Sequence, residues 1–190
     1  MYTQGNDIRL SGFTDADWAG SSIDHKCTTG YCFNIGSGMT SWRSRKQKSV
    51  ALSSTEAEYM AVSTTSCEAI WLRKLLVNLC KRRMEATRIM CDNQGCINLS
   101  ENPVFHDRSK HIDIRYHFVG DCVQRGAVQL RYTPTREQEV DILTKALGRT
   151  KFVFLMRRWD GEESISVAET YSIGSCSAAT SNGSAMGNMM

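Results

Sequence analysis

The chain has 190 residues, 41% hydrophobic and 23% charged, a composition typical of a globular protein with one domain and a substantial core. No apolar run approaches the roughly 18 residues that a membrane span needs, and the N-terminus lacks the apolar segment of a signal peptide. We therefore expect an intracellular protein, cytoplasmic or nuclear, with no membrane partner.

The net charge of +3 is unevenly distributed. All 23 Lys and Arg lie at or before Arg158, whereas residues 161–190 carry three Glu and no basic residue. The preceding 160 residues therefore carry a charge of +6, which fits a polyanionic partner without demanding one.

Eight cysteines are scattered along the chain without a CxxC pair, which argues against a zinc knuckle or ribbon. In an intracellular chain we interpret them mostly as small apolar residues of the core.

The first predicted elements are strands. A short apolar run over residues 8–14 predicts a strand that ends at Asp15. The segment "TTGYCFNIGSGMTSWRS" then predicts two strands joined by a turn at Gly36–Gly38.

A long helix follows, and Ser53 with Glu56 three residues later forms a capping box at its start. Steps of three and four residues from Glu58 trace an apolar stripe along this helix. The stripe consists of Ala61, Val62, Ala69, Leu72 and Leu76.

The second half of the chain alternates strands and helices. "ATRIMCD" predicts a buried strand ending in Asp92, followed by a short helix before Pro103 and a long helix that Gly126 ends. "AVQLRYTP" predicts the fifth strand, and we expect a last helix from about Glu137 to Leu147. This β-β-β-α-β-α-α-β-α order predicts an α/β fold, a mixed five-stranded sheet flanked by helices.

The composition changes after about Trp159. The last 30 residues contain seven serines and four glycines. We predict one domain over residues 8–158 and a flexible low-complexity tail over residues 159–190.

Four carboxylates occupy positions suited to one site. Asp15 and Asp92 end predicted strands, and Glu58 and Asp141 lie near predicted helix starts. If the two strands are parallel neighbours, all four side chains reach one edge of the sheet, where Mg²⁺ or Mn²⁺ would relieve their repulsion. Acidic residues also favour turns and first helical turns for structural reasons alone, so position by itself leaves both interpretations open.

The amino-acid sequence of four motifs is more specific than the positions of the carboxylates. "GFTDADWAGS", "SWRSRKQKSVALSSTEAEYMA", "IMCDNQGCINLSENPVFHDRSKHIDIRYHF" and "VDILTKAL" closely resemble the ribonuclease H domain of copia-type LTR retrotransposon polyproteins. The resemblance runs from about Leu10 to about Leu155. It implies a ribonuclease H-like fold, cleavage of the RNA strand of an RNA–DNA hybrid with two Mg²⁺ or Mn²⁺ ions, and a reverse transcriptase domain in the same polyprotein.

The resemblance also implies a catalytic, metal-binding set that falls on Asp15, Glu58, Asp92 and Asp141. We predict that the neighbouring Asp17 lies inside the turn after the strand, where it serves that turn or supports a metal ligand without being one. Glu56 is the alternative to Glu58 for the acidic position on this helix. The capping box gives Glu56 a structural role, and only Glu58 lies on the apolar stripe, so we choose Glu58.

One feature departs from many cellular ribonucleases H, which carry a histidine between the last strand and the final Asp. Here that segment, "TPTREQEVD", has none. For His106, His111 and His117 we favour hydrogen bonding or packing over catalysis.

A basic cluster precedes the first long helix. Arg43, Arg45, Lys46 and Lys48 lie close to a helix N-terminus, which itself attracts phosphate. A charge run is usually a solvated surface, but here we predict sequence-independent contacts with the nucleic-acid backbone.

Two other functions stay open. The chain is alternatively a non-catalytic remnant that at most binds nucleic acid, or another nuclease or integrase of the same fold. The motif containing Glu58 and the strand ending in Asp92 argue against the latter.

Overall fold

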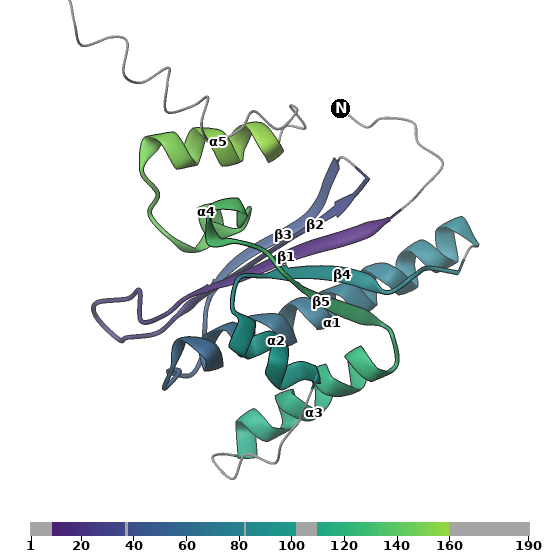
Figure 1. The fold of residues 1–190 in the computed structure, drawn as a ribbon, viewed down its shortest axis with the longest axis horizontal. Coiled ribbons are helices and arrows are strands. Elements are labelled where there is room, and N and C mark those ends of the chain that lie inside the picture. Colours follow the sequence, from purple (N-terminus) through teal and green to yellow (C-terminus); the bar gives the residue numbers. More distant parts are fainter. Residues whose placement is uncertain (1–8, 37, 82, 102–109, 160–190) are drawn as a thin grey trace, which may run out of the picture.

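The computed structural model describes residues 9–36, 38–81, 83–101 and 110–159, which form a mixed five-stranded sheet with helices on both faces (Figure 1). The strands are β1 (Leu10–Asp17), β2 (Thr28–Ile35), β3 (Gly38–Lys46), β4 (Thr87–Cys91) and β5 (Val128–Tyr132). Their order across the sheet is β3-β2-β1-β4-β5. The mixed five-stranded sheet predicted from the sequence is confirmed.

The helices form one layer on each side of the sheet. They are α1 (Ser54–Cys80), α2 (Gln94–Glu101), α3 (Lys110–Gln124), α4 (Asp141–Thr144) and α5 (Arg149–Trp159). The first three pack on one face and on one another, whereas α4 covers the opposite face over β1, β2 and β3. Neighbouring residues of β1 point to opposite faces, so Thr14 meets α1 and Asp15 meets α4.

The register of the central strands brings two aspartates to one edge. β1 runs parallel to β4, and their last pair is Phe13 with Met90. Asp15 and Asp92 each lie two residues beyond that pair, so they lie side by side where the pairing of β1 with β4 ends. The expectation that these two strands are parallel neighbours is confirmed.

The prediction for the end of β1 is wrong in one respect. β1 does not end at Asp15 but continues to Asp17, because its antiparallel pairing with β2 extends to the pair Asp17–Thr28. Asp17 is therefore the last strand residue, not part of the turn, and its carboxylate lies against Gly20.

Ser53 caps α1, as predicted: its Oγ accepts a hydrogen bond from Glu56 N at 3.1 Å. The return bond of the capping box is displaced by one residue, because Glu56 Oε2 accepts from Leu52 N at 2.8 Å and not from Ser53 N. All five members of the predicted apolar stripe are buried, and so is Glu58 at its start. The cap determines where α1 begins and the stripe determines which face packs on the sheet, so together they position Glu58 at the sheet edge.

The next two helices begin and end at side chains suited to those positions. Asn93 Oδ1 accepts from Cys96 N at 2.9 Å and caps α2 directly after Asp92. Gly126, at φ +64, ends α3 in a left-handed conformation that favours glycine.

The predicted helix from Glu137 to Leu147 is wrong. The structure has a 3-10 turn over Thr135–Glu137, the short helix α4 and the separate helix α5. Lys145 is extended at the end of α4, and the new helix begins after Gly148. The prediction that Asp141 lies at a helix start is correct.

The main core lies between the sheet and α1–α3 and contains Phe33, Tyr59 and Ile89 among its buried residues. Five of the seven described cysteines are buried and all seven are free thiols, which supports their interpretation as core residues. The predicted tail, apart from Trp159, and His106 lie outside the described residues. In the described part of the chain, every helix is too short or too polar to cross a membrane.

Candidate active site

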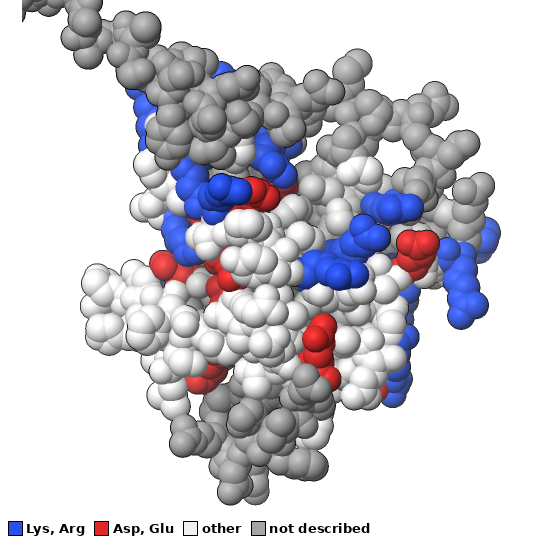
Figure 2. Space-filling view, viewed as in Figure 1, with Lys and Arg blue, Asp and Glu red and all other residues white. Residues whose placement is uncertain are grey.

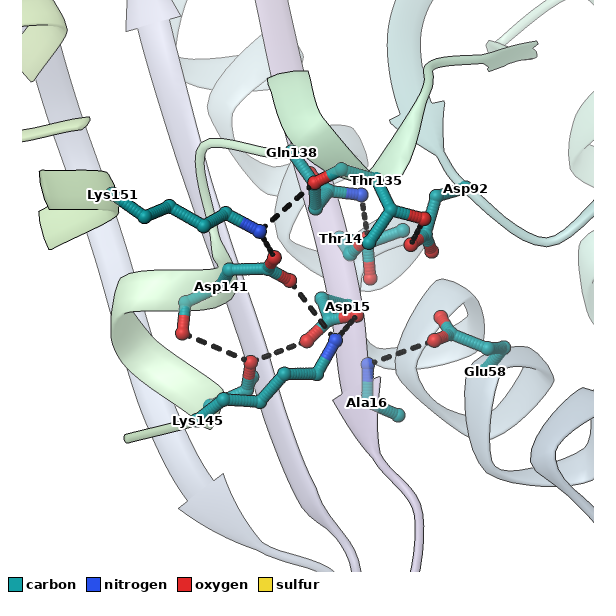
Figure 3. A network of polar contacts seen from close by, with 11 residues as sticks. Thr14, Asp15, Ala16, Glu58, Asp92, Thr135, Gln138, Asp141, Lys145 and Lys151 are labelled. Carbon is teal, nitrogen blue, oxygen red and sulfur yellow. Dashed lines mark hydrogen bonds and ion pairs between the residues drawn. The ribbon is translucent and has the colours of Figure 1, made fainter. Parts of the chain in front are cut away.

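Asp15 lies fully buried in β1, with both carboxylate oxygens engaged from the α4 side of the sheet. Oδ1 accepts from Lys145 Nζ at 3.1 Å, and Oδ2 accepts a hydrogen bond from the Thr144 hydroxyl. Lys145 also donates to Asp141 Oδ1 at 3.0 Å, so one ammonium joins two buried carboxylates (Figure 3). Lys151 of α5 donates to the other oxygen of Asp141.

Burial dominates the electrostatics of this pair. It raises the pKa of Asp15, and Asp141 raises it further, whereas Lys145 and Thr144 oppose the rise. Burial also disfavours the charge on Lys145, but the two aspartates raise the pKa of this lysine above its ordinary value. Lys145 is therefore charged and compensates part of the negative charge of the pair.

Glu58 reaches the same edge of the sheet from α1. Its Oε1 accepts from Ala16 N at 3.1 Å, and its buried Oε2 has no hydrogen-bond partner among the described residues. Burial, followed by electrostatic interactions with Cys91, Asp15 and Asp92, raises the pKa of Glu58 from an ordinary 4.5 to about 10. Without a metal ion, Glu58 therefore holds a proton at neutral pH.

Asp92 is half-buried directly after β4, and its Oδ2 accepts from Thr135 Oγ1 at 2.9 Å. Glu58, Cys91 and Asp92 each place a ligand atom so that the three lie within 4.8 Å of one another. Carboxylate and thiolate groups at this separation can hold a divalent metal ion.

All four predicted carboxylates surround the carboxyl end of β1, in two unequal halves (Figure 3). Asp15 and Asp141 are bridged by Lys145, whereas Glu58 and Asp92 have no cation bridging them among the described residues. The structure thus brings the predicted residues together, and their role as metal ligands remains a prediction.

The chain is similar in sequence to a part of transposon polyproteins. It is 47% identical over 149 residues to the retrovirus-related Pol polyprotein of transposon RE1 from Arabidopsis thaliana, covering 78% of the chain and 10% of the polyprotein. It is 44% identical over 148 residues to that of transposon TNT 1-94 from Nicotiana tabacum, covering 78% and 11%. The chain spans about a tenth of the length of these curated relatives. No protein-family profile matches it.

Solved structures identify the fold. LC11-RNase H1 in complex with an RNA/DNA hybrid superposes with a TM-score of 0.52 at 11% identity, over 72% of this chain and 94% of that one. The N-terminal ribonuclease H domain of a Mycobacterium tuberculosis protein gives 0.53 at 10% identity, over 80% and 98%. The chain is a ribonuclease H-fold homologue of retrovirus-related Pol polyproteins. This confirms the resemblance to copia-type sequences.

The raised pKa of Glu58 predicts an unusual pH dependence for this ribonuclease H-fold chain. Between pH 4.5 and about 10 the native state holds a proton that the unfolded state releases, so stability falls as pH rises. The slope contributed by Glu58 approaches about 1.4 kcal/mol per pH unit. We expect Glu58→Gln to remove this slope and to be more stable than the unmutated chain at pH 8.

Urea unfolding of both proteins with a chelator, at pH 5, 6.5 and 8, measures the difference in the free energy of unfolding. A difference that stays constant across the three pH values would contradict the raised pKa.

The predicted nucleic-acid contacts are exposed on and just beyond β3. Arg43, Arg45, Lys46 and Lys48 line a pocket of about 160 Å³ together with Arg115 of α3. The side chain between them, Gln47, is buried and donates to Ala57 O at 3.0 Å, which ties this pocket to the first turn of α1. Glu58 directly follows Ala57, so the basic cluster and one of the four carboxylates both lie at the start of α1. Phosphate contacts from the cluster remain a prediction.

Further basic side chains gather over α5 and over the open face of β4 and β5 (Figure 2). Arg88 and Arg131 are exposed on these two strands. Of the three histidines considered above, His117 is exposed on α3, and the structure describes only the backbone of His111. Neither therefore changes the composition of the site.

Sequence reasoning missed the residues that support the carboxylates. Lys145 follows Asp141 by four residues, and this i,i+4 spacing could have indicated the ion pair. Lys151 carried no such signal, because α5 was not predicted. Gln138 is also fully buried and donates to Thr14 O at 2.9 Å, which anchors the segment before α4 on β1.

Proposed function

We propose that this chain is a divalent-metal-dependent endoribonuclease that cleaves the RNA strand of RNA–DNA hybrids. The observation that carries the proposal is the meeting of four acidic side chains, from β1, α1, α4 and the residue directly after β4, at one sheet edge. The capture of a protein of this fold in complex with an RNA/DNA hybrid supports the choice of substrate.

The donor set fits hard divalent cations. Glu58 Oε2 is buried without a hydrogen-bond partner in the described part of the chain, and a cation would satisfy it. We assign two Mg²⁺ or Mn²⁺ ions to the four carboxylates, because carboxylate oxygens suit these ions. When bound, such ions activate a water and stabilise the leaving oxygen during phosphodiester hydrolysis.

The chain's own residues orient the carboxylates. The Ala16 N–H holds Glu58, and the Thr135 hydroxyl holds Asp92. Lys145 keeps the other two aspartates together and reduces their repulsion before metal arrives. These hydrogen bonds restrict each side chain to one position, which is the pre-organisation that catalysis requires.

Metal binding predicts a shift in melting temperature. Mg²⁺ or Mn²⁺ should raise it, because a ligand that binds only the native state stabilises that state. Asp92→Asn should lose most of the shift, and in a chelator it should be at least as stable as the unmutated chain, since one repelling charge is gone.

Asp121→Asn is the matched control, because Asp121 of α3 forms a surface ion pair with Arg125, which directly follows this helix. Differential scanning fluorimetry measures all three proteins with and without metal. Equal metal shifts in the Asp92 variant and the unmutated chain would exclude Asp92 as a ligand.

We assign hybrid binding to the basic cluster of Arg43, Arg45, Lys46 and Lys48. Lysine and arginine contacts to phosphate position a nucleic acid without reading its sequence, and they weaken as salt increases. Because the relatives are Pol polyproteins, we further propose a reverse transcriptase domain of such a polyprotein as the partner in a longer product.

One observation favours a second candidate, a non-catalytic fragment that only binds nucleic acid. Lys145 and Lys151 already engage Asp15 and Asp141 without any metal ion. Because these lysines compensate the charges of the two aspartates, this half of the site does not need a metal ion to be stable, as expected of a fragment that does not catalyse hydrolysis.

Digestion of three labelled substrates separates these functions. The chain is incubated with an RNA–DNA hybrid, an RNA duplex and a DNA duplex, each with Mg²⁺ and with a chelator. We expect cleavage of the hybrid alone, and only with Mg²⁺. Binding without cleavage would support the non-catalytic fragment, and cleavage of the DNA duplex would indicate another nuclease of this fold.

A further inference from the structure

Cys91 is a buried thiol beside the proposed catalytic carboxylates, and the proposed reaction does not use it. It is the last residue of β4, directly before Asp92, and is fully buried. Its Sγ, a carboxylate oxygen of Glu58 and one of Asp92 all lie within 4.8 Å of one another.

Glu58 provides a second, independent observation at this position. The residue is 5% exposed, and its Oε2 has no hydrogen-bond partner in the described part of the structure. In Figure 3 the oxygen of Glu58 that carries no hydrogen bond points toward Asp92. A buried oxygen without a partner is costly, and a cation between the three side chains would satisfy it.

The mixed donor set differs from an all-oxygen site in its metal preference. Carboxylates alone suit Mg²⁺ and Mn²⁺, whereas a thiolate favours the softer Zn²⁺ and Cd²⁺. Three protein ligands of this kind leave one position of a tetrahedral zinc site for water. Asp92 is only half-buried, so the cluster is open to solvent on its side.

We propose that Glu58, Cys91 and Asp92 form a binding site for a thiophilic divalent cation, Zn²⁺ or Cd²⁺, that competes with Mg²⁺ for the two carboxylates. Binding forms a metal–sulfur bond and releases to solvent both the thiol proton and the proton that Glu58 holds in the absence of metal. The consequence for catalysis, inhibition by Zn²⁺ in the presence of Mg²⁺, rests on the proposed function. The binding itself does not.

Cd²⁺ provides the test, because a cadmium–thiolate bond has an ultraviolet charge-transfer absorption. The metal-free chain is titrated with Cd²⁺, and binding is followed by this absorption and by calorimetry. We expect one tight equivalent whose absorption disappears in Cys91→Ser and Cys91→Ala, with the affinity of that site lowered about tenfold or more. Two substitutions are used because Cys91 is a core residue, and circular dichroism verifies the fold of each.

Three further variants and a competition make the result specific. Cys67→Ser and Cys80→Ser are controls, because Cys67 is exposed and Cys80 half-buried on α1, and they should leave the tight equivalent unchanged. Glu58→Gln should weaken Cd²⁺ binding, and excess Mg²⁺ should displace Cd²⁺ from the unmutated chain.

Unchanged Cd²⁺ binding in folded Cys91 variants would overturn the proposal. So would unchanged binding in Glu58→Gln, which would instead indicate thiol ligands alone. The two proposals fail separately. Cd²⁺ bound as expected by a chain that never cleaves hybrid contradicts only the proposed function, and cleavage without the cadmium site contradicts only this inference.

Discussion

Asp15→Asn should reduce cleavage of the RNA strand by about 10²–10³-fold, the magnitude typical of losing one pre-organised electrostatic group. Asparagine keeps the size and one acceptor oxygen of Asp15, but it lacks the charge that divalent ions require. The variant should still bind hybrid, because the basic cluster on and just beyond β3 is unchanged. Initial cleavage rates and hybrid affinity, measured at one salt concentration, separate the two effects.

Asp17→Asn is the matched control, two residues further along the same strand. Asp17 is half-buried at the end of β1, and its carboxylate lies against Gly20. Asparagine serves such a position nearly as well as aspartate, so its cleavage rate should change only a few-fold. Equal losses in the two variants would contradict the assignment of Asp15.

Lys145→Met should have the largest effect on stability when metal is absent. Asp15 and Asp141 are 0% and 1% exposed, and the substitution removes the ammonium that joins them. Removing one partner of a buried ion pair typically costs about 3–5 kcal/mol, and the partial exposure of Lys145 places the expected loss at about 3 kcal/mol. Mg²⁺ should restore part of this loss, because a bound cation takes over the compensation of charge.

Lys46→Met is the control for Lys145. Lys46 also donates to a carboxylate, that of Asp24 at 3.1 Å, but both side chains are exposed. Such a surface pair contributes about 0–1 kcal/mol. Urea unfolding in chelator and in Mg²⁺ gives the free energy of unfolding of each variant. A Lys145 variant as stable as the Lys46 variant in chelator would refute the bridging role.

Local sequence signals predicted the elements that hold two of the carboxylates. The capping box and the apolar stripe determine the start and the buried face of α1, so the position of Glu58 follows from residues within a few turns. The strand before Asp92 was equally clear, because its apolar residues Ile89–Cys91 are contiguous.

The end of β1 and the division of the last predicted helix depend on contacts between segments far apart in the sequence. The end of β1 moved from Asp15 to Asp17 because β2 continues to pair there, which no residue near Asp17 signals. The helix expected from Glu137 to Leu147 is divided because Gln138 is anchored on β1 and Lys145 turns toward Asp15. Long-range hydrogen bonds of this kind override local helix propensity.

The chemistry of the site was only partly visible in the sequence. The four carboxylates were predicted from position and family resemblance, but their division into a lysine-bridged half and an open half was not. That division depends on side-chain contacts across more than 120 positions of sequence, such as Lys145 with Asp15. The proximity of Cys91 to Glu58 likewise requires the packing of α1 on β4.

Digestion of a single RNA–DNA hybrid with both strands labelled, by the unmutated chain in Mg²⁺, tests the proposed activity most directly. We expect the RNA label to shorten while the DNA label stays at full length, and a chelator to stop the reaction. A hybrid that is bound but left intact on both strands, or one that is cut on both, would contradict the proposed activity.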